Sequence, residues 1–228
     1  MTGKKRLDGR EADETRKIEA KVGIIENAAG SAYFAFGDTK AIAAVYGPKL
    51  MYPQHSQDQT KATLKCIYDM LSFSVNERKK PGPSRRSMEI SQVTKWAFEP
   101  VVELKLFPST EIDIYIMIMQ ADASTRCAGI NAASMALAQA GIPMKELVTA
   151  VSAGKVEDKI VVDLCYEEEA VEGATDIAFA FTPSKKITLM QLDGEISPED
   201  LKKARALAEK TCQKIYKKME EALKSIKE

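Results

Sequence analysis

The amino-acid sequence predicts an α+β fold, a mixed β-sheet with packed helices in a single domain spanning 1–228. Three observations support this: alternating apolar stretches typical of strands in both halves, helical apolar periods between and after them, and no low-complexity tract or repeat that divides the chain. With 228 residues, 45% of them hydrophobic, the chain is long enough to bury a core. Within this domain we expect an N-terminal extension at 1–16 and a C-terminal helix at 197–228.

The sequence pattern of the first half of the chain predicts a group of strands. Residues 17–26 alternate apolar and charged side chains, as in a half-buried strand. The stretches 31–36 and 40–46 flank a Gly-Asp pair, which is typical of a hairpin turn. Residues 62–75 alternate again and 112–119 is strongly apolar, so each predicts a further strand.

Two helices are predicted among these strands. The charged stretch 77–86, rich in proline and glycine, indicates a loop. From Ser87 to Leu104 the apolar residues follow a helical stripe, and we expect Pro108 to end this helix. Residues 124–140 are rich in small side chains and are followed by glycine and proline, which predicts a second helix that packs closely against a sheet.

The second half predicts four strands and a long helix. Ser197-Pro198 followed by two acidic residues suits a helix start, because serine caps the end, proline fits the first position and acids stabilise the first turn. The strands expected before it are 148–156, 160–166, 176–182 and 187–192.

Composition and charge argue against several classes of function. The 33 basic and 33 acidic residues balance, so a nucleic-acid site needs a local basic patch. No apolar run approaches the roughly 20 residues that span a bilayer, and the polar N-terminus differs from a secretory signal, so we expect a cytoplasmic protein without a membrane partner. The four cysteines lie far apart in the sequence, which argues against a zinc site, and the single histidine argues against histidine-dependent catalysis. The sequence has no glycine-rich nucleotide-binding motif, which argues against a nucleotide cofactor. We expect that histidine, His55, to be a solvated residue.

Two basic stretches carry side chains that suit anions. Five basic residues lie within nine positions from Arg78 to Arg86, and an arginine pair at a helix start can clamp phosphate through paired hydrogen bonds. Ser124, Thr125 and Arg126 follow a strand and open a helix, where backbone N–H groups bind anions. A solvated basic loop and an ordinary serine cap explain the same residues, and both alternatives stay open.

A third stretch is acidic. It runs from Asp163 through 167–169 to Asp176, and carboxylates clustered after a strand can hold a metal ion or supply a general acid. A polar loop between strands is the simpler interpretation. Near the N-terminus, the residues 8–10 by themselves predict a turn and nothing more.

In combination and order, these motifs resemble the RNase PH superfamily, and within it the catalytic RNase PH-like subunit of the archaeal exosome. The resemblance extends from Asp8 to the last predicted helix. The matching stretches are DGR (8–10), AVYGPK (44–49), ERKKPGPSRR (77–86), QADASTR (120–126), ALAQAGIPM (136–144) and LMQLDGEI (189–196).

The resemblance implies an RNase PH-like fold, of the ribosomal protein S5 domain 2-like type. It implies a subunit that shortens single-stranded RNA from the 3′ end by phosphorolysis, releases nucleoside diphosphates and tails RNA in reverse. Inorganic phosphate is then the co-substrate, and Mg²⁺ is a candidate metal. The implied partners are RNA, an inactive RNase PH-like paralogue in a hexameric ring (a trimer of heterodimers) and RNA-binding cap proteins.

The resemblance also implies roles for the basic stretches. An arginine pair binds the 3′ end of the RNA, and the loop that opens the second helix binds phosphate. The family usually has glycine at the position of Ser124, so we expect its Cβ to narrow the pocket or shift the backbone. The matching RNA-binding residues are Arg78, Arg85 and Arg86, and the matching phosphate-binding residues are Ser124, Thr125, Arg126 and Arg86.

In the acidic stretch, Asp176 matches a family acid tied to metal or acid function, and we interpret it as a catalytic residue and a metal ligand. The family has aspartate where this chain has Glu169, and the interval from there to Asp176 is one residue longer. Glu169 is the second catalytic candidate, with Glu168 as its alternative. Two other functions stay open: a catalytically inactive, RNA-holding ring subunit, and a homohexameric tRNA-trimming RNase PH.

Overall fold

The computed structural model describes residues 6–225 and divides their strands between two sheets. The strands are β1 (Ile18–Val22), β2 (Gly30–Phe36), β3 (Thr39–Leu50), β4 (Thr63–Met70), β5 (Thr110–Gln120), β6 (Thr149–Val156), β7 (Lys159–Val162), β8 (Thr175–Phe181) and β9 (Ile187–Asp193). The helices are α1 (Arg85–Phe98), α2 (Thr125–Gln139), α3 (Tyr166–Glu169) and α4 (Pro198–Lys224), with short 3-10 turns η1 (Gln54–Ser56) and η2 (Leu104–Leu106).

The first sheet is mixed and the second is antiparallel. In the order β1-β2-β3-β5-β4, only β4 runs parallel to its neighbour, β5. The second sheet has the order β7-β6-β8-β9. The predicted mixed sheet with packed helices is therefore confirmed for the first half, whereas the second half builds a sheet of its own.

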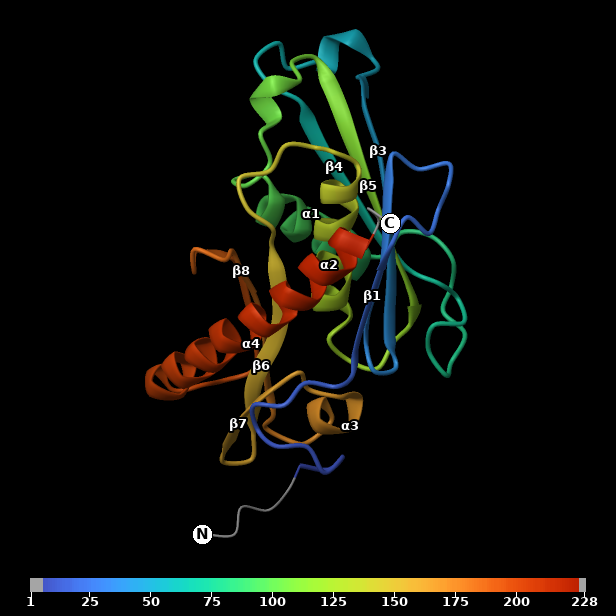
Figure 1. Cartoon of the computed structure of the whole chain (residues 1–228). Coiled ribbons are helices and arrows are strands. Elements are labelled where there is room, and N and C mark those ends of the chain that lie inside the picture. Colours follow the sequence, from blue (N-terminus) through green and yellow to red (C-terminus); the bar gives the residue numbers. More distant parts are fainter. Residues whose placement is uncertain (1–5, 226–228) are drawn as a thin grey trace.

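Helix α2 lies at the centre of the molecule and contacts strands of both sheets (Figure 1). Its buried residues point in every direction around the axis, as expected of a helix that is covered on all sides. The packing is close: a Cβ added at Gly30 of β2 would lie 2.2 Å from the carbonyl oxygen of Ala136 in α2. This confirms the prediction of close packing and explains why the helix is built from small residues.

The other two long helices also contact strands of both sheets. Helix α4 crosses β6 and reaches β1 near its C-terminal end (Figure 1), and its start is confirmed because the Ser197 side chain accepts a hydrogen bond from the Asp200 N–H. Helix α1 packs on β4 and β9. Residues 1–5 of the expected extension and 226–228 of the expected C-terminal helix lie outside the described residues. Within 6–225, no helix is long and apolar enough to cross a membrane.

The hairpin of β2 and β3 is confirmed, whereas the boundaries of other predicted elements are wrong. Helix α1 ends at Phe98 and not near Leu104, because Pro100 has no N–H to continue the helical hydrogen bonds. The strand expected at 160–166 ends at Val162, because Asp163 adopts a left-handed backbone with φ of 52°. The chain then forms the short helix α3, which places its acidic residues on a turn at the end of the sheet.

Candidate active site

A cavity of about 260 Å³ collects basic and acidic side chains from both halves of the chain. We refer to it as the charged cavity. Four of the predicted site residues meet there, each at the end of an element: Arg86 and Arg126 in the first turns of α1 and α2, Glu169 at the end of α3 and Asp176 at the start of β8. The complete lining is Arg86, Arg126, Glu169, Ala174, Asp176, Asp193 and Gly194.

The basic side of the charged cavity suits an anion. The Nε of Arg126 is buried and has no hydrogen-bond partner within the protein. A buried guanidinium N–H without a partner is costly, so this position favours a ligand that accepts a hydrogen bond. Both arginines lie in the first turns of their helices, where unpaired backbone N–H groups and the helix dipole also favour negative charge.

The acidic side holds carboxyl groups that are hard to ionise. Burial raises the pKa of Asp176 to about 6, with Asp193 adding to the effect and Arg126 opposing it, and Oδ1 of Asp176 has no partner. Glu169 is exposed as a residue, but its carboxyl group faces the cavity. Desolvation there and the neighbouring Asp176 raise its pKa to about 7. A carboxyl group with that pKa is partly protonated at neutral pH and can donate a proton.

The neighbouring Glu168 has a different environment from Glu169. Its two carboxylate oxygens accept hydrogen bonds from Nε and Nη2 of Arg6, at 2.7 and 2.6 Å. Burial opposes its ionisation, but the ion pair with Arg6 outweighs burial and lowers its pKa. The two candidates for the acid are thereby separated: Glu169 faces the cavity, and Glu168 is held within the protein.

The hydroxyl groups of Ser124 and Thr125 are engaged inside the protein. Ser124 Oγ lies 2.8 Å from Ser152 Oγ and donates to the Leu164 carbonyl oxygen, and Thr125 Oγ1 accepts from the Tyr68 hydroxyl. Ser124 therefore meets an anion only through its backbone N–H, which also interacts with the Glu169 carboxyl group, whereas the Thr125 hydroxyl keeps its own hydrogen to donate.

The alternative of an ordinary serine cap is wrong, because the Ser124 side chain makes no capping hydrogen bond. Its φ of 51° is left-handed, a conformation that glycine adopts without steric cost. This explains why glycine suits the same position.

The remaining predicted basic residues lie apart from the charged cavity. Arg85 and Arg78 are exposed and do not line it. His55 is exposed in η1, as expected of a solvated residue. A larger groove of about 650 Å³ lies between β4 and α1. Among residues 6–225, none of those that line this groove has a buried charged atom without a hydrogen-bond partner, which is the feature that marks the charged cavity. We therefore place the candidate site in the smaller cavity.

The carboxyl groups on the acidic side are the candidate ligands for a metal ion. Among the described residues, no three His, Cys, Asp or Glu side chains form a ready metal cluster. Mg²⁺ is commonly held by one or two carboxylates together with substrate phosphate and water, and the unpartnered oxygen of Asp176 suits that role. Asp193, in the same cavity, was not predicted as a site residue, although it lies within the LMQLDGEI stretch.

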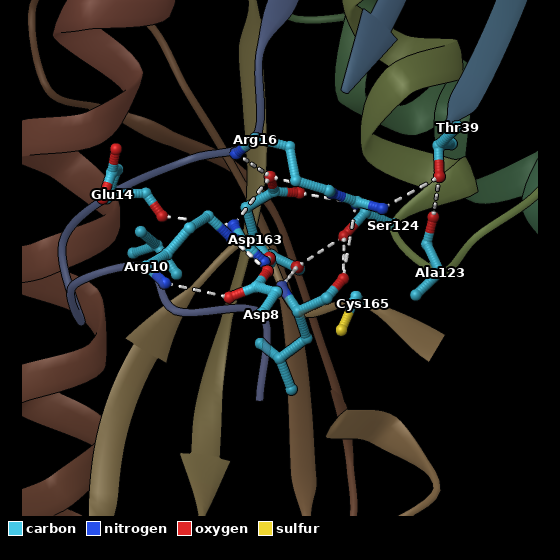
Figure 2. Close-up of polar contacts among 12 residues, drawn as sticks. Asp8, Arg10, Glu14, Arg16, Thr39, Ala123, Ser124, Asp163 and Cys165 are labelled. Carbon is cyan, nitrogen blue, oxygen red and sulfur yellow. Dashed lines mark hydrogen bonds and ion pairs between the residues drawn. The ribbon is translucent and has the colours of Figure 1, made fainter. Parts of the chain in front are cut away.

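The sequence interpretation also missed a set of arginines near the N-terminus. Arg6, Arg10 and Arg16 converge on Asp163 and Glu168, and we refer to these five residues as the arginine cluster. Figure 2 shows Arg10 and Arg16 beside Asp163. The predicted turn at 8–10 is confirmed. Three arginines within the first sixteen residues were the available signal, but nothing in the sequence showed which acids they meet.

Comparisons with known proteins agree with this architecture. The family model described as "3' exoribonuclease family, domain 1" matches residues 14–143, and the model for domain 2 of that family matches 146–211. The chain is 49% identical to the exosome complex component Rrp41 of Methanopyrus kandleri, over 96% of this chain and 92% of the relative. It is 52% identical to Rrp41 of Pyrococcus furiosus, over 96% and 88%.

Solved structures show the same fold. Rice Rrp46 has a TM-score of 0.86 at 25% identity, with 96% of this chain and 100% of that chain covered. An Archaeoglobus fulgidus exosome with RNA bound to the active site has a TM-score of 0.82 at 22% identity, with 94% and 92% covered. The matching domain models and these close relatives together establish that the chain belongs to the 3′ exoribonuclease family, with an RNase PH-like fold.

Proposed function

We propose that this chain is a phosphorolytic 3′→5′ exoribonuclease subunit that acts at the charged cavity. The observation that carries the proposal is the meeting of two arginines and two carboxyl groups of raised pKa in one cavity, where buried atoms of Arg126 and Asp176 lack partners. Such a site suits a reaction between two anions that ends with transfer of a proton. Membership of the 3′ exoribonuclease family supports this choice.

In the proposed reaction, an oxygen of inorganic phosphate attacks the phosphorus of the last phosphodiester. The bond from that phosphorus to O3′ of the preceding nucleotide breaks, and O3′ takes a proton. The products are a nucleoside diphosphate and an RNA shorter by one nucleotide. The reverse reaction adds a nucleotide from a diphosphate.

The residues divide this work by their chemistry. Arg86 and Arg126 neutralise the two reacting anions, and the backbone N–H groups of Ser124 and Thr125 assist in seating phosphate. Glu169, with its pKa near 7, donates the proton to O3′. If Mg²⁺ binds at Asp176, it supplies further charge neutralisation to the leaving oxygen.

Residues outside the cavity and partner chains complete the proposal. The exposed Arg78 and Arg85 contact the RNA backbone as it enters. In this proposal the chain assembles with an RNase PH-like paralogue into a hexameric ring that bears RNA-binding cap proteins, in the cytoplasm. The relatives named exosome complex components support assembly into a complex. One cluster of buried side chains includes residues of both sheets, which supports one folding unit for the chain.

The test is an RNA degradation assay on the chain mixed with its candidate partner subunit. Single-stranded poly(A) is incubated with and without inorganic phosphate, after size measurement of the single chain and of the mixture. We expect nucleoside diphosphates only when phosphate is present. An assembled ring that binds RNA but forms no product would overturn the proposal in favour of a structural subunit.

A further inference from the structure

The arginine cluster links the N-terminal segment to the two parts of the chain that deliver site residues. The side chains of Arg6 and Glu168 are 4% and 2% exposed, and those of Arg16 and Asp163 are 9% and 0% exposed. Charges this deeply buried persist only when they are paired, because an unpaired buried charge is strongly destabilising. The cluster is therefore a fixed framework of ion pairs.

Arg6 fixes the orientation of α3. Besides its paired hydrogen bonds to Glu168, it donates to the carbonyl oxygens of Val162 and Asp163, at 2.8 and 3.0 Å. A four-residue helix has no stability of its own, so its rotation depends on such contacts. Because Glu168 and Glu169 are adjacent on α3, holding Glu168 against Arg6 directs Glu169 to the charged cavity.

Arg16 ties α3 to the loop before α2. Its Nη2 and Nε donate to the two carboxylate oxygens of Asp163, at 2.7 and 3.1 Å. Its Nη1 donates to the carboxylate of Asp122 at 3.1 Å and to the Thr39 hydroxyl. The Thr39 hydroxyl in turn donates to the carbonyl oxygens of Asp122 and Ala123, and Figure 2 shows its contact with Ala123. The other oxygen of Asp122 accepts from the Tyr166 N–H, the first residue of α3.

The loop before α2 needs such support, because two of its residues adopt strained backbone conformations. Ala123 and Ser124 have φ of 54° and 51°, a region that residues other than glycine seldom occupy. Strain of this kind persists only where the surroundings hold it in place. Arg16 and Thr39 hold the loop from one side, and the hydrogen bonds of Ser124 to Ser152 and Leu164 hold it from the other.

We propose that Arg6 and Arg16 are positioning residues for phosphorolysis: Arg6 sets the direction of Glu169, and Arg16 sets the distance between α3 and the anion-binding start of α2. This inference rests on the proposed function. Neither arginine lines the charged cavity, so both act through the residues they hold. Displacement of a reacting group by about 1 Å can lower a rate about 100-fold, which sets the scale of the expected effects.

The test compares Arg6→Gln and Arg16→Gln with Arg10→Gln in the assembled complex. Arg10 is the matched control, because it belongs to the same cluster but its hydrogen bonds end on Asp8, Glu14 and Asp163, and its ion pair with Glu168 is long, at 3.8 Å. For Arg6→Gln we expect kcat to fall about 100-fold, with KM for phosphate changed less than about twofold. For Arg16→Gln we expect the same fall in kcat, together with a rise of about tenfold in KM for phosphate.

Conservative rescue and a binding measurement separate positioning from simple loss of folded protein. All rates are expressed per assembled ring. Arg6→Lys keeps the charge but not the paired hydrogen bonds to Glu168, so it should lose less kcat than Arg6→Gln without reaching the wild-type value. Equal losses in all three glutamine variants, or losses that vanish once rates are corrected for assembled protein, would overturn the inference.

If the wild type shows no phosphorolysis, the proposed function fails. Binding of inorganic phosphate to the chain, measured by titration, then tests the role of Arg16. Weaker binding by Arg16→Gln than by Arg10→Gln supports the inference, and equal binding overturns it.

Discussion

The charged cavity and the arginine cluster contain the same kinds of side chain in opposite states. In the cluster, every carboxylate meets a guanidinium, and the pKa of Glu168 is lowered. In the cavity, Arg126 and Asp176 keep unpartnered atoms, and the pKa values of Asp176 and Glu169 are raised. Adjacent glutamates on one short helix thus differ in ionisation, because one is paired and the other is desolvated beside a like charge. The buried charges of the cluster depend on one another, because removal of either partner leaves an unpaired buried charge, whereas the unpartnered atoms of the cavity are available to a ligand.

The largest effect is expected from Arg126→Ala, which removes the unpartnered guanidinium from the cavity. Loss of one donor to a developing charge typically lowers a rate about 100- to 1,000-fold, and we expect the phosphate-dependent rate to fall by that amount. Product release from poly(A) at several phosphate concentrations measures it. Arg205→Ala on the exposed side of α4 is the control and should match the wild type. An unchanged rate in Arg126→Ala would refute its role.

Glu169→Gln should lower kcat about 100-fold, because an amide cannot supply the proton. Its thermal unfolding midpoint should be equal to or higher than that of the wild type, because the substitution removes repulsion with Asp176. Single-turnover rates and a melting curve measure both quantities. Full activity in this variant would assign the proton to another group, with Asp176→Asn as the next variant to measure.

Asp163→Asn should reduce the stability of the fold, because Asp163 is the buried carboxylate that Arg10 and Arg16 share. The substitution keeps the shape and the tolerance of a left-handed backbone, but it leaves the buried arginines without their carboxylate. We expect the free energy of unfolding to fall by about 3 kcal/mol in urea denaturation. Asp158→Asn, at an exposed turn, should stay within about 0.5 kcal/mol. Equal stability of both variants would show that the cluster carries no net stabilisation.

The pH dependence should distinguish the two glutamates. Glu169 has a raised pKa in the folded state, so its contribution to stability is full below its ordinary pKa of 4.5 and is lost as pH rises through about 7. Glu168 has a lowered pKa, so its contribution is present above 4.5 and is lost as pH falls through its folded-state pKa. Between pH 5 and 8, the stability difference between wild type and Glu169→Gln should therefore shift in favour of the variant. The wild-type rate should also fall about tenfold per unit above pH 7, where the acid form disappears. A flat difference in stability would contradict the placement of this carboxyl group.

The smallest effects are expected from Arg78→Ala and Arg85→Ala, which lie outside the cavity. Each should raise KM for RNA a few-fold and leave KM for phosphate unchanged. Loss of one phosphate contact should also reduce the slope of log affinity against log salt by about 0.7 for a single strand. A change in KM for phosphate would show that these arginines reach further into the cavity than their exposure indicates.

The sequence predicted most elements because their signals are local. The hairpin turn, the capped start of α4 and the small-residue helix α2 each depend on neighbouring residues, and the structure confirms all three. Division into two sheets and the parallel pairing of β4 with β5 depend on contacts between distant residues, which no local pattern encodes. The end of β7 at Val162 was missed for the same reason, since its cause is the capture of Asp163 by arginines about 150 residues earlier.

The candidate site was predictable in residue type and less so in geometry. The arginines Arg86 and Arg126 and the acids Glu169 and Asp176 were identified, whereas Asp193 of the same cavity was missed. The choice between Glu168 and Glu169 was not, because it depends on which carboxyl group meets Arg6. The hydroxyl groups of Ser124 and Thr125 suited an anion by type alone, but the fold uses them inside the protein.

The central position of α2 between the sheets has a consequence for synthesis of the protein. The cavity takes its arginines from elements before residue 143 and its carboxyl groups from elements after residue 146. A ribosome therefore delivers the basic side of the cavity before the acidic side. Because α2 is buried against strands of both sheets, the arginines and the carboxyl groups meet only after the last sheet has packed on α2. The complete site therefore forms only when the whole domain has folded.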